Sequence, residues 1–155
     1  MDNLPDIFNT LLVPEQINEF WEDAGSVAGN MAPKDTLVIT CPLGNEGKDR
    51  AQLLKMLQAC KLEDHQYNLI ELPEDKLIGW HRLKEALKPR YILLVGIDPQ
   101  QLGMSVVFMP HQVSRFDQAV WVFTWSIPQL EQYPEAKKHL WQYGLKPVFV
   151  EQSFE

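Results

Sequence analysis

Short apolar runs rich in β-branched residues alternate along the chain with segments whose apolar residues follow helical spacing. The apolar runs predict β-strands at residues 36–41, 66–72, 91–95 and 119–124, and a short edge strand at 106–109. Helical spacing predicts helices at residues 14–21, 50–60, 75–87 and 134–143, the last closed by Gly144. The tail, residues 147–154, is expected to be a loop or a late strand. Strands joined by helices predict the α/β class, as a three-layer α/β/α sandwich with a mostly parallel central sheet.

The N-terminal part of the chain does not show this alternation of strands and helices. Residues 1–34 are predicted to form an arm and a helix, and residues 35–155 to form a single α/β domain. The arm carries apolar residues at helical spacing, which we call the N-terminal stripe: Leu4, Ile7, Phe8, Leu11 and Leu12. Such a stripe must be covered, either by its own domain or by another protein, and the sequence leaves both possibilities open.

Composition narrows the function classes. The chain has 155 residues, is 45% hydrophobic and carries a net charge of -7. An acidic chain disfavours tight DNA binding, which needs a basic surface to displace counterions. No apolar run reaches the roughly 18 residues of a membrane span. The N-terminus carries Asp2 and Asp6 and no basic stretch, so we expect no secretory signal and a cytoplasmic protein.

The residues that could carry chemistry are few. Cys41 and Cys60 are in no metal-binding motif and are expected to be reduced thiols in the core, and no metal or cofactor is expected. The glycine-containing loop at residues 42–49 departs from a phosphate-binding loop, because Pro42 and Asp49 stand where a glycine and a hydroxyl residue are needed. The four histidines are scattered, and each is expected at the surface: His65, His81, His111 and His139.

Two further patterns each have a structural and a functional interpretation. Asp98, in the sequence Gly-Ile-Asp-Pro after a predicted strand, could orient a water molecule as a general base, but turn formation is favoured. Trp121, Phe123 and Trp125 share one face of a strand and could stack on bases. No Lys or Arg lies between Arg115 and Lys137 to bind phosphates, so core packing is favoured.

The order of elements resembles the uracil-DNA glycosylase superfamily over residues 36–145. The resemblance rests on a Pro-Gly loop after the first strand, Leu53, Leu54 and Leu57 on the next helix, and a closing helix that carries Pro134 and Trp141. In that family a carboxylate on the first loop activates water, and a histidine opens the last loop. The corresponding residues here are Thr40 and Thr124. The resemblance therefore implies a vestigial pocket without catalytic residues, made of Thr40, Cys41, Pro42, Thr124, Trp125 and Ser126.

The chain is also similar to a non-catalytic branch of this fold, the psi-subunit family of the bacterial DNA polymerase III clamp loader. The residues that match this family are Leu130, Pro134, Ala136, Leu140 and Trp141. In that family an N-terminal arm engages the clamp loader and the globular part binds the chi subunit. The likeness implies that the N-terminal stripe binds a protein partner, a replisome subunit as in that family.

Three functions stay open at this point. The first is a non-enzymatic interaction subunit. The second is a diverged base-excision enzyme that uses Asp98 or Glu46 as its base, with Ser126 at the pocket. The third is a small-molecule binder that reuses the pocket. A pocket plugged by Trp125 or Tyr133 would favour the first, and an open pocket with an aromatic floor and an amide would favour the others.

Overall fold

The computed structural model describes residues 31–152, so the N-terminal stripe and the helix predicted at 14–21 lie outside the described residues. The described chain forms one five-stranded sheet in the order β2-β1-β3-β5-β4. Four strands are parallel: β1 (Thr36–Thr40), β2 (Tyr67–Glu71), β3 (Tyr91–Val95) and β5 (Ala119–Thr124). The edge strand β4 (Gln112–Phe116) is antiparallel to β5. The prediction of an α/β fold with a mostly parallel sheet is confirmed.

Strand β4 corrects the prediction of an edge strand at residues 106–109, which belong to an irregular segment before it. β4 and β5 form a hairpin whose two-residue turn is Asp117 and Gln118, both with positive φ (51° and 64°). This is the backbone of the turn type that matches the twist of paired strands. Asp117 is held there by the indole Nε1 of Trp80, which donates to its carboxylate at 2.7 Å. A tertiary contact therefore supports the turn.

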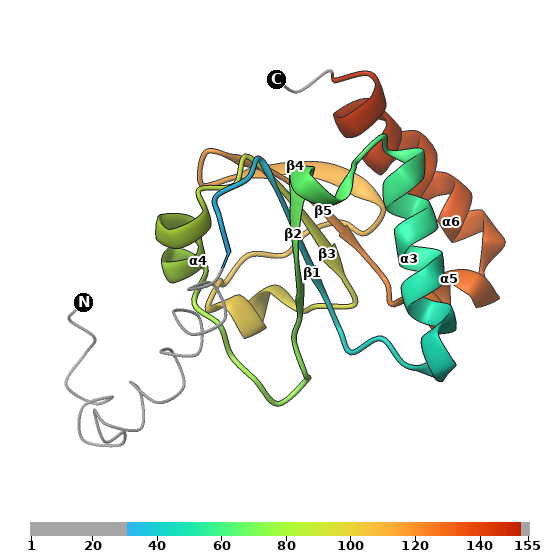
Figure 1. Cartoon of the computed structure of the whole chain (residues 1–155), viewed down its shortest axis with the longest axis horizontal. Coiled ribbons are helices and arrows are strands. Elements are labelled where there is room, and N and C mark those ends of the chain that lie inside the picture. The colour runs from blue at the N-terminus through green and yellow to red at the C-terminus, as the bar shows by residue number, and fades with distance from the viewer. Residues whose placement is uncertain (1–30, 153–155) are drawn as a thin grey trace.

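Helices lie on both faces of the sheet (Figure 1). α4 (Trp80–Leu87) is on one side, and α3 (Lys48–Ala59), α5 (Ile127–Gln132) and α6 (Pro134–Leu140) are on the other. Short 3-10 turns precede α3, β2 and the irregular segment: η1 (Asn45–Gly47), η2 (Asp64–Gln66) and η3 (Pro99–Leu102). The helix predicted at 75–87 begins only at Trp80, and α5 is a helix that was not predicted from the sequence.

The end of the chain also differs from the prediction. α6 continues into η4 (Trp141–Val150), a π-helical segment, where a loop or strand was expected. Gly144 does not cap a helix but lies inside η4, where an added Cβ would be 3.1 Å from Val122 Cγ1. The glycine is needed for this close approach of η4 to the sheet, and the prediction that it ends a helix is wrong.

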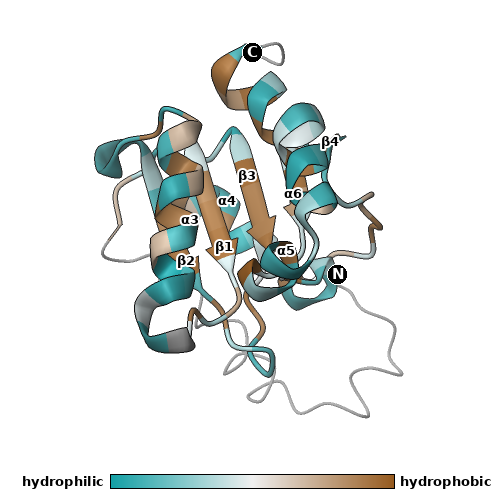
Figure 2. Ribbon diagram, turned by 90° about the vertical axis from the view of Figure 1, so that its right-hand side faces the viewer, coloured by the Kyte–Doolittle hydropathy of each residue, from teal (hydrophilic) through white to brown (hydrophobic). Residues whose placement is uncertain are grey.

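The apolar residues form two clusters, one on each face of the sheet, because successive strand residues point to opposite sides. Leu37 and Ile39 pack with α4, whereas Val38 between them packs with α3, α5 and α6. Trp121 is fully buried among the first cluster, which confirms its predicted place in the core. Figure 2 shows the result: apolar strands β1 and β3 between helices of mixed character. Among the described helices, none is both long enough and apolar enough to cross a bilayer.

Candidate functional site

The residues of the predicted vestigial pocket meet at the carboxyl edge of the parallel strands, where open α/β sheets bind their ligands. β3 lies between β1 and β5, and the register aligns Thr40 with Val95 and Val95 with Thr124. The backbone N–H of Cys41 donates to the carbonyl of Val95 at 3.0 Å, and that of Gly96 donates to the carbonyl of Thr124 at 2.9 Å. The strand ends therefore bring the first and last loops close together.

The two threonines predicted to stand at catalytic positions, Thr40 and Thr124, face inward. Both are completely buried. The hydroxyl of Thr40 donates to the carbonyl of Cys41 at 3.0 Å, and the hydroxyl of Thr124 lies 2.9 Å from Nδ1 of His111. Neither hydroxyl is available to a ligand or a water molecule at the surface.

Gly96 fills the space directly between the two loops. It has a φ of +69°, and a Cβ built on it would lie 2.8 Å from Cys41 Sγ and 3.0 Å from Ser126 Cβ. Real Cβ atoms do not approach other atoms so closely. The backbone of Gly96 thus packs directly against Cys41 and Ser126. Neither Trp125 nor Tyr133, the two side chains whose insertion would have favoured the interaction subunit, supplies any of the three atoms nearest to that Cβ.

Two open depressions flank this point. One, of about 580 Å³, is mainly apolar and is called here the edge groove: it is lined by residues 96–100 and 104–108, by Phe123, Thr124 and Trp125, and by Gln129. The other, of about 790 Å³, is called the polar cleft and is lined by Cys41, Pro42, Leu72, Glu74, Leu77, Gly96, Asp98, Gln100, Gln101, Ser126 and Gln129. The predicted pocket residues therefore do not face one cavity: Cys41, Pro42 and Ser126 line the polar cleft, Thr124 and Trp125 line the edge groove, and Thr40 lines neither.

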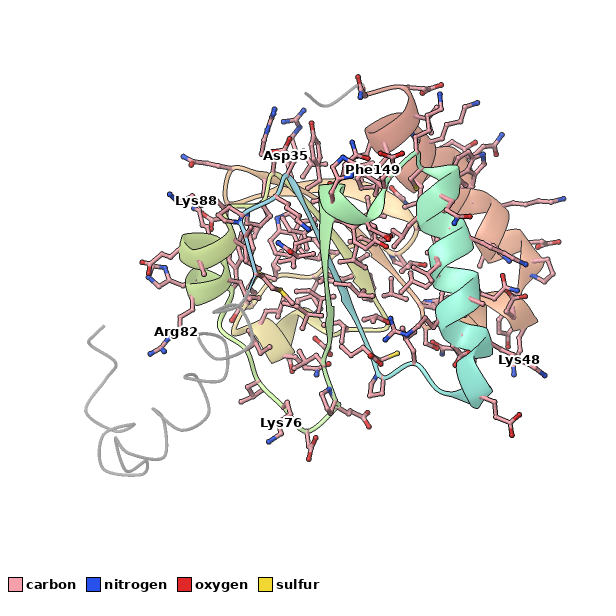
Figure 3. All side chains as sticks on the ribbon, viewed as in Figure 1. Asp35, Lys48, Lys76, Arg82, Lys88 and Phe149 are labelled. Atoms are coloured by element: carbon pink, nitrogen blue, oxygen red, sulfur yellow. The ribbon has the colours of Figure 1, made fainter. Side chains whose placement is uncertain are left out.

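Charge around these depressions is sparse and negative. Asp98 lines both, Glu74 lines the polar cleft, and within residues 31–152 no Lys or Arg lines either. Lys48 and Lys76, the cations labelled at this end of the molecule, extend away from the sheet (Figure 3). A phosphate group would find a carboxylate and no cation here.

The residues that the enzyme hypothesis needs, Asp98, Ser126 and Glu46, either form hydrogen bonds with residues close by in the sequence or lie away from both depressions. Oδ1 of Asp98 accepts the backbone N–H of Gln100 at 2.9 Å and caps η3, so the turn interpretation is confirmed. Ser126 begins α5, and its hydroxyl donates to Oε1 of Gln129 at 3.1 Å. Glu46 lies exposed in η1 and lines neither the edge groove nor the polar cleft.

His111 is a buried residue that the sequence did not indicate. It was expected at the surface, as were His65 and His81, which are exposed, and His139, which is half-buried. The ring of His111 packs edge-on against Trp125 at 4.6 Å between centroids, and its Nε2 has no hydrogen-bond partner among the described residues. Burial, and then the neighbouring His139, lower the pKa of His111. A neutral imidazole is favoured at this position.

The two cysteines differ in their surroundings. Cys60 is buried, and burial raises the pKa of its thiol to about 12. Cys41 is half-buried at the polar cleft, and burial also raises its pKa. Both thiols are free, as expected. In the described part of the chain, no three His, Cys, Asp or Glu side chains are grouped so that they could hold a metal ion.

The carboxyl edge therefore offers shape and apolar surface, with little reactive chemistry. It contains two depressions, one carboxylate shared between them and a buried neutral histidine beneath one wall. Comparison of the sequence with models of known protein families and with curated proteins gives no match.

Proposed function

We propose that the protein is a non-enzymatic subunit that binds other proteins, built on a three-layer α/β/α sandwich of the uracil-DNA glycosylase type. One observation carries the proposal: Thr40 and Thr124, which stand where that family has its carboxylate and histidine, are neutral, fully buried and hydrogen-bonded inside the protein. Base excision needs a group that positions water and a donor for the charge that develops on the leaving base. Neither threonine can supply these functions.

Exposed apolar side chains support a role in protein interaction. Val107 is 90% exposed and Met109 is 60% exposed, both beside the edge groove. The likeness to the psi-subunit family suggests partners in the cytoplasmic replisome, with the N-terminal stripe as one contact. The stripe lies outside the described residues, so this part of the proposal rests on the sequence.

The experiment is reconstitution with the purified clamp-loader subunits of the organism that encodes the protein, followed by size-exclusion chromatography. We expect a complex that is lost when residues 1–12 are removed or Phe8 is changed to Asp, with no change in melting temperature. Asn9→Asp, which adds the same charge to the polar side of the stripe, should leave the complex intact. Absence of any complex with the full chain would contradict the replisome assignment.

The enzyme alternative is tested separately by uracil release from single- and double-stranded DNA at high protein concentration. We expect no release above the buffer rate. Turnover that disappears in Asp98→Asn or Glu46→Gln would reverse the proposal and assign the chain to the base-excision enzymes.

A second candidate function, small-molecule binding, is favoured by the edge groove itself. Its volume of about 580 Å³ lies within the range of ligand pockets, and Phe123, Trp125 and the amide of Gln129 contribute to its lining. A thermal-shift screen with free nucleobases and nucleosides tests it. A stabilising compound whose effect vanishes in Phe123→Ala would support this candidate.

A further inference from the structure

Residues 105–109 have the side-chain pattern of a β-strand but belong to no sheet. Met104 and Phe108 are buried and Val106 is half-buried, whereas Ser105, Val107 and Met109 between them are exposed. Phe108 fixes the inner side of the segment, since its ring stacks on Trp121 at 5.3 Å between centroids. The period of two that predicted a strand here is therefore present in the structure without the partner strand.

The backbone of this segment is unsatisfied. Within residues 31–152, no N–H or carbonyl of residues 105–109 forms a hydrogen bond with another backbone group. Just beyond, Met104 donates to the carbonyl of Pro99 at 3.2 Å and His111 donates to that of Phe123 at 2.7 Å. Both ends of the segment are thus tied to the fold, while the donors and acceptors in its middle bond to no other described residue.

Nothing charged protects this segment. No Asp, Glu, Lys or Arg occurs between Asp98 and Arg115, in a chain of which 23% is charged. Natural proteins keep exposed strand edges from pairing by placing charges, proline or bulges on them. Pro110 protects one end of the segment in this way. The exposed positions within it carry Ser105, Val107 and Met109, none of which is charged.

We propose that residues 105–109 dock an extended segment of a partner protein, which pairs with them as an added strand and places alternate apolar side chains in the edge groove. Strand addition supplies affinity through main-chain hydrogen bonds and specificity through every second side chain. This inference rests on the proposed function as an interaction subunit and names the surface and the chemistry of the partner.

The charge of the groove specifies the partner further. Among the described residues, Asp98 is the one charged residue that lines it, and its Oδ2 accepts no hydrogen bond from them, because the cap of η3 uses Oδ1. The docked segment therefore carries a Lys or Arg that pairs with Asp98. A second copy of this chain fits less well, since its residues 99–114 contain no cation and each copy has a net charge of -7.

The test uses the full chain and a displayed library of random linear 12-residue peptides as the probe. Enriched peptides should share apolar residues at alternate positions and a Lys or Arg. Their affinity, measured with labelled synthetic copies, should fall at least tenfold in Val107→Asp and in Asp98→Asn. Ala59→Asp, at an exposed position of α3 outside the edge groove, is the matched charge control and should change affinity less than twofold.

Amide hydrogen exchange then reports the pairing directly. On peptide binding, alternate amides among residues 105–109 should exchange at least tenfold more slowly. The proposal would be overturned if no peptide were enriched, or if the enriched peptides bound Val107→Asp as tightly as the unmodified protein. Peptide binding that left the exchange of these amides unchanged would overturn it too. So would sedimentation that shows self-association lost in Val107→Asp, which would make a second copy the occupant. Peptide binding that survives Val107→Asp, in a protein whose clamp-loader complex still depends on residues 1–12, would refute this surface while leaving the proposed function intact.

Discussion

Nδ1 of His111 lies 2.9 Å from the hydroxyl oxygen of Thr124, and both side chains are buried at the end of β5. The backbone N–H of His111 also donates to the carbonyl of Phe123 at 2.7 Å, and the residue has a φ of 63°. These contacts fasten the chain to the sheet just after the irregular segment of residues 105–109. The imidazole thus occupies a structural position beneath the wall of the edge groove.

Stability should depend on pH through His111. Its pKa in the folded protein is lowered from 6.5, by burial first and then by His139, so the unfolded chain binds the proton more readily. The contribution of neutral His111 to the free energy of unfolding is complete above pH 6.5. It is lost as the pH falls below that value toward the pKa of His111 in the folded protein. The urea midpoint should therefore drop between pH 7.5 and pH 5.5.

Two variants identify the group responsible. His111→Asn, which tolerates the positive φ, should flatten this part of the pH profile. His81→Asn, at an exposed position, should keep the slope of the unmodified protein. Equal slopes in the unmodified protein and His111→Asn would show that another group titrates.

Gly96→Ala should destabilise the protein by roughly 2–4 kcal/mol, because it adds a Cβ to a crowded position and strains a left-handed backbone. The new atom would lie 2.8 Å from Cys41 Sγ, at a φ of +69°. The free energy of unfolding in urea measures the effect. The double variant Gly96→Ala, Cys41→Ala should recover part of the loss, since the sulfur is gone while the backbone strain stays.

Gly44→Ala is the matched control. An added Cβ at Gly44 meets no atom within 4 Å and its φ is not positive, so the change should be close to neutral. A Gly96→Ala protein as stable as Gly44→Ala would mean that the first and last loops are not in the close contact described.

The sequence predicted most of the sheet because its strands are continuous apolar runs, as at Tyr91–Val95, whose limits were predicted correctly. It did not predict the β4–β5 hairpin, since Asp117 and Gln118 are not a usual turn pair. Their positive φ values depend on a tertiary contact from Trp80. The end of the fold was misread for a similar reason: Gly144 permits close packing on Val122 and does not end a helix.

The candidate site was predictable only in its location. Carboxyl ends of neighbouring parallel strands meet, so Cys41, Thr124 and Ser126 could be placed together from the sequence. The close packing around Gly96 could not, because it depends on how near Cys41 and Ser126 come to Gly96 in three dimensions, where a Cβ built on the glycine would lie 2.8–3.1 Å from their atoms. Burial of His111 likewise depends on the path of the irregular segment, and no local pattern around Pro110 indicated it.

We expect no tight binding of single-stranded DNA at physiological salt. The carboxyl-edge depressions are lined by Asp98 and Glu74 without a cation, and the net charge is -7. Fluorescence anisotropy of a labelled oligonucleotide should barely change on adding the protein. Sub-micromolar affinity with a steep salt dependence would contradict this. Charge reversal at Lys61 and Arg90, which line a depression at the amino edge with Lys34, would then locate the site.

The two thiols should react at very different rates in the native protein. Cys60 is 1% exposed with a pKa raised to about 12, whereas Cys41 is half-buried at the polar cleft, with a pKa that burial raises as well. The thiolate is the reacting species, so a disulfide reagent at pH 8 should modify Cys41 first, more slowly than a free thiol. Cys60 should react at least about tenfold more slowly, as the protein unfolds.

Single variants show which cysteine accounts for the fast, early phase of the reaction and which for the slow one. Cys41→Ala should abolish the early phase, and Cys60→Ala should leave it unchanged. In denaturant both thiols of the unmodified protein should react together, because burial no longer distinguishes them. If Cys60 reacted as fast as Cys41 in the native protein, the burial of Cys60 at the C-terminal end of α3 would be contradicted. If no thiol reacted in denaturant, the finding that both cysteines are free would be contradicted.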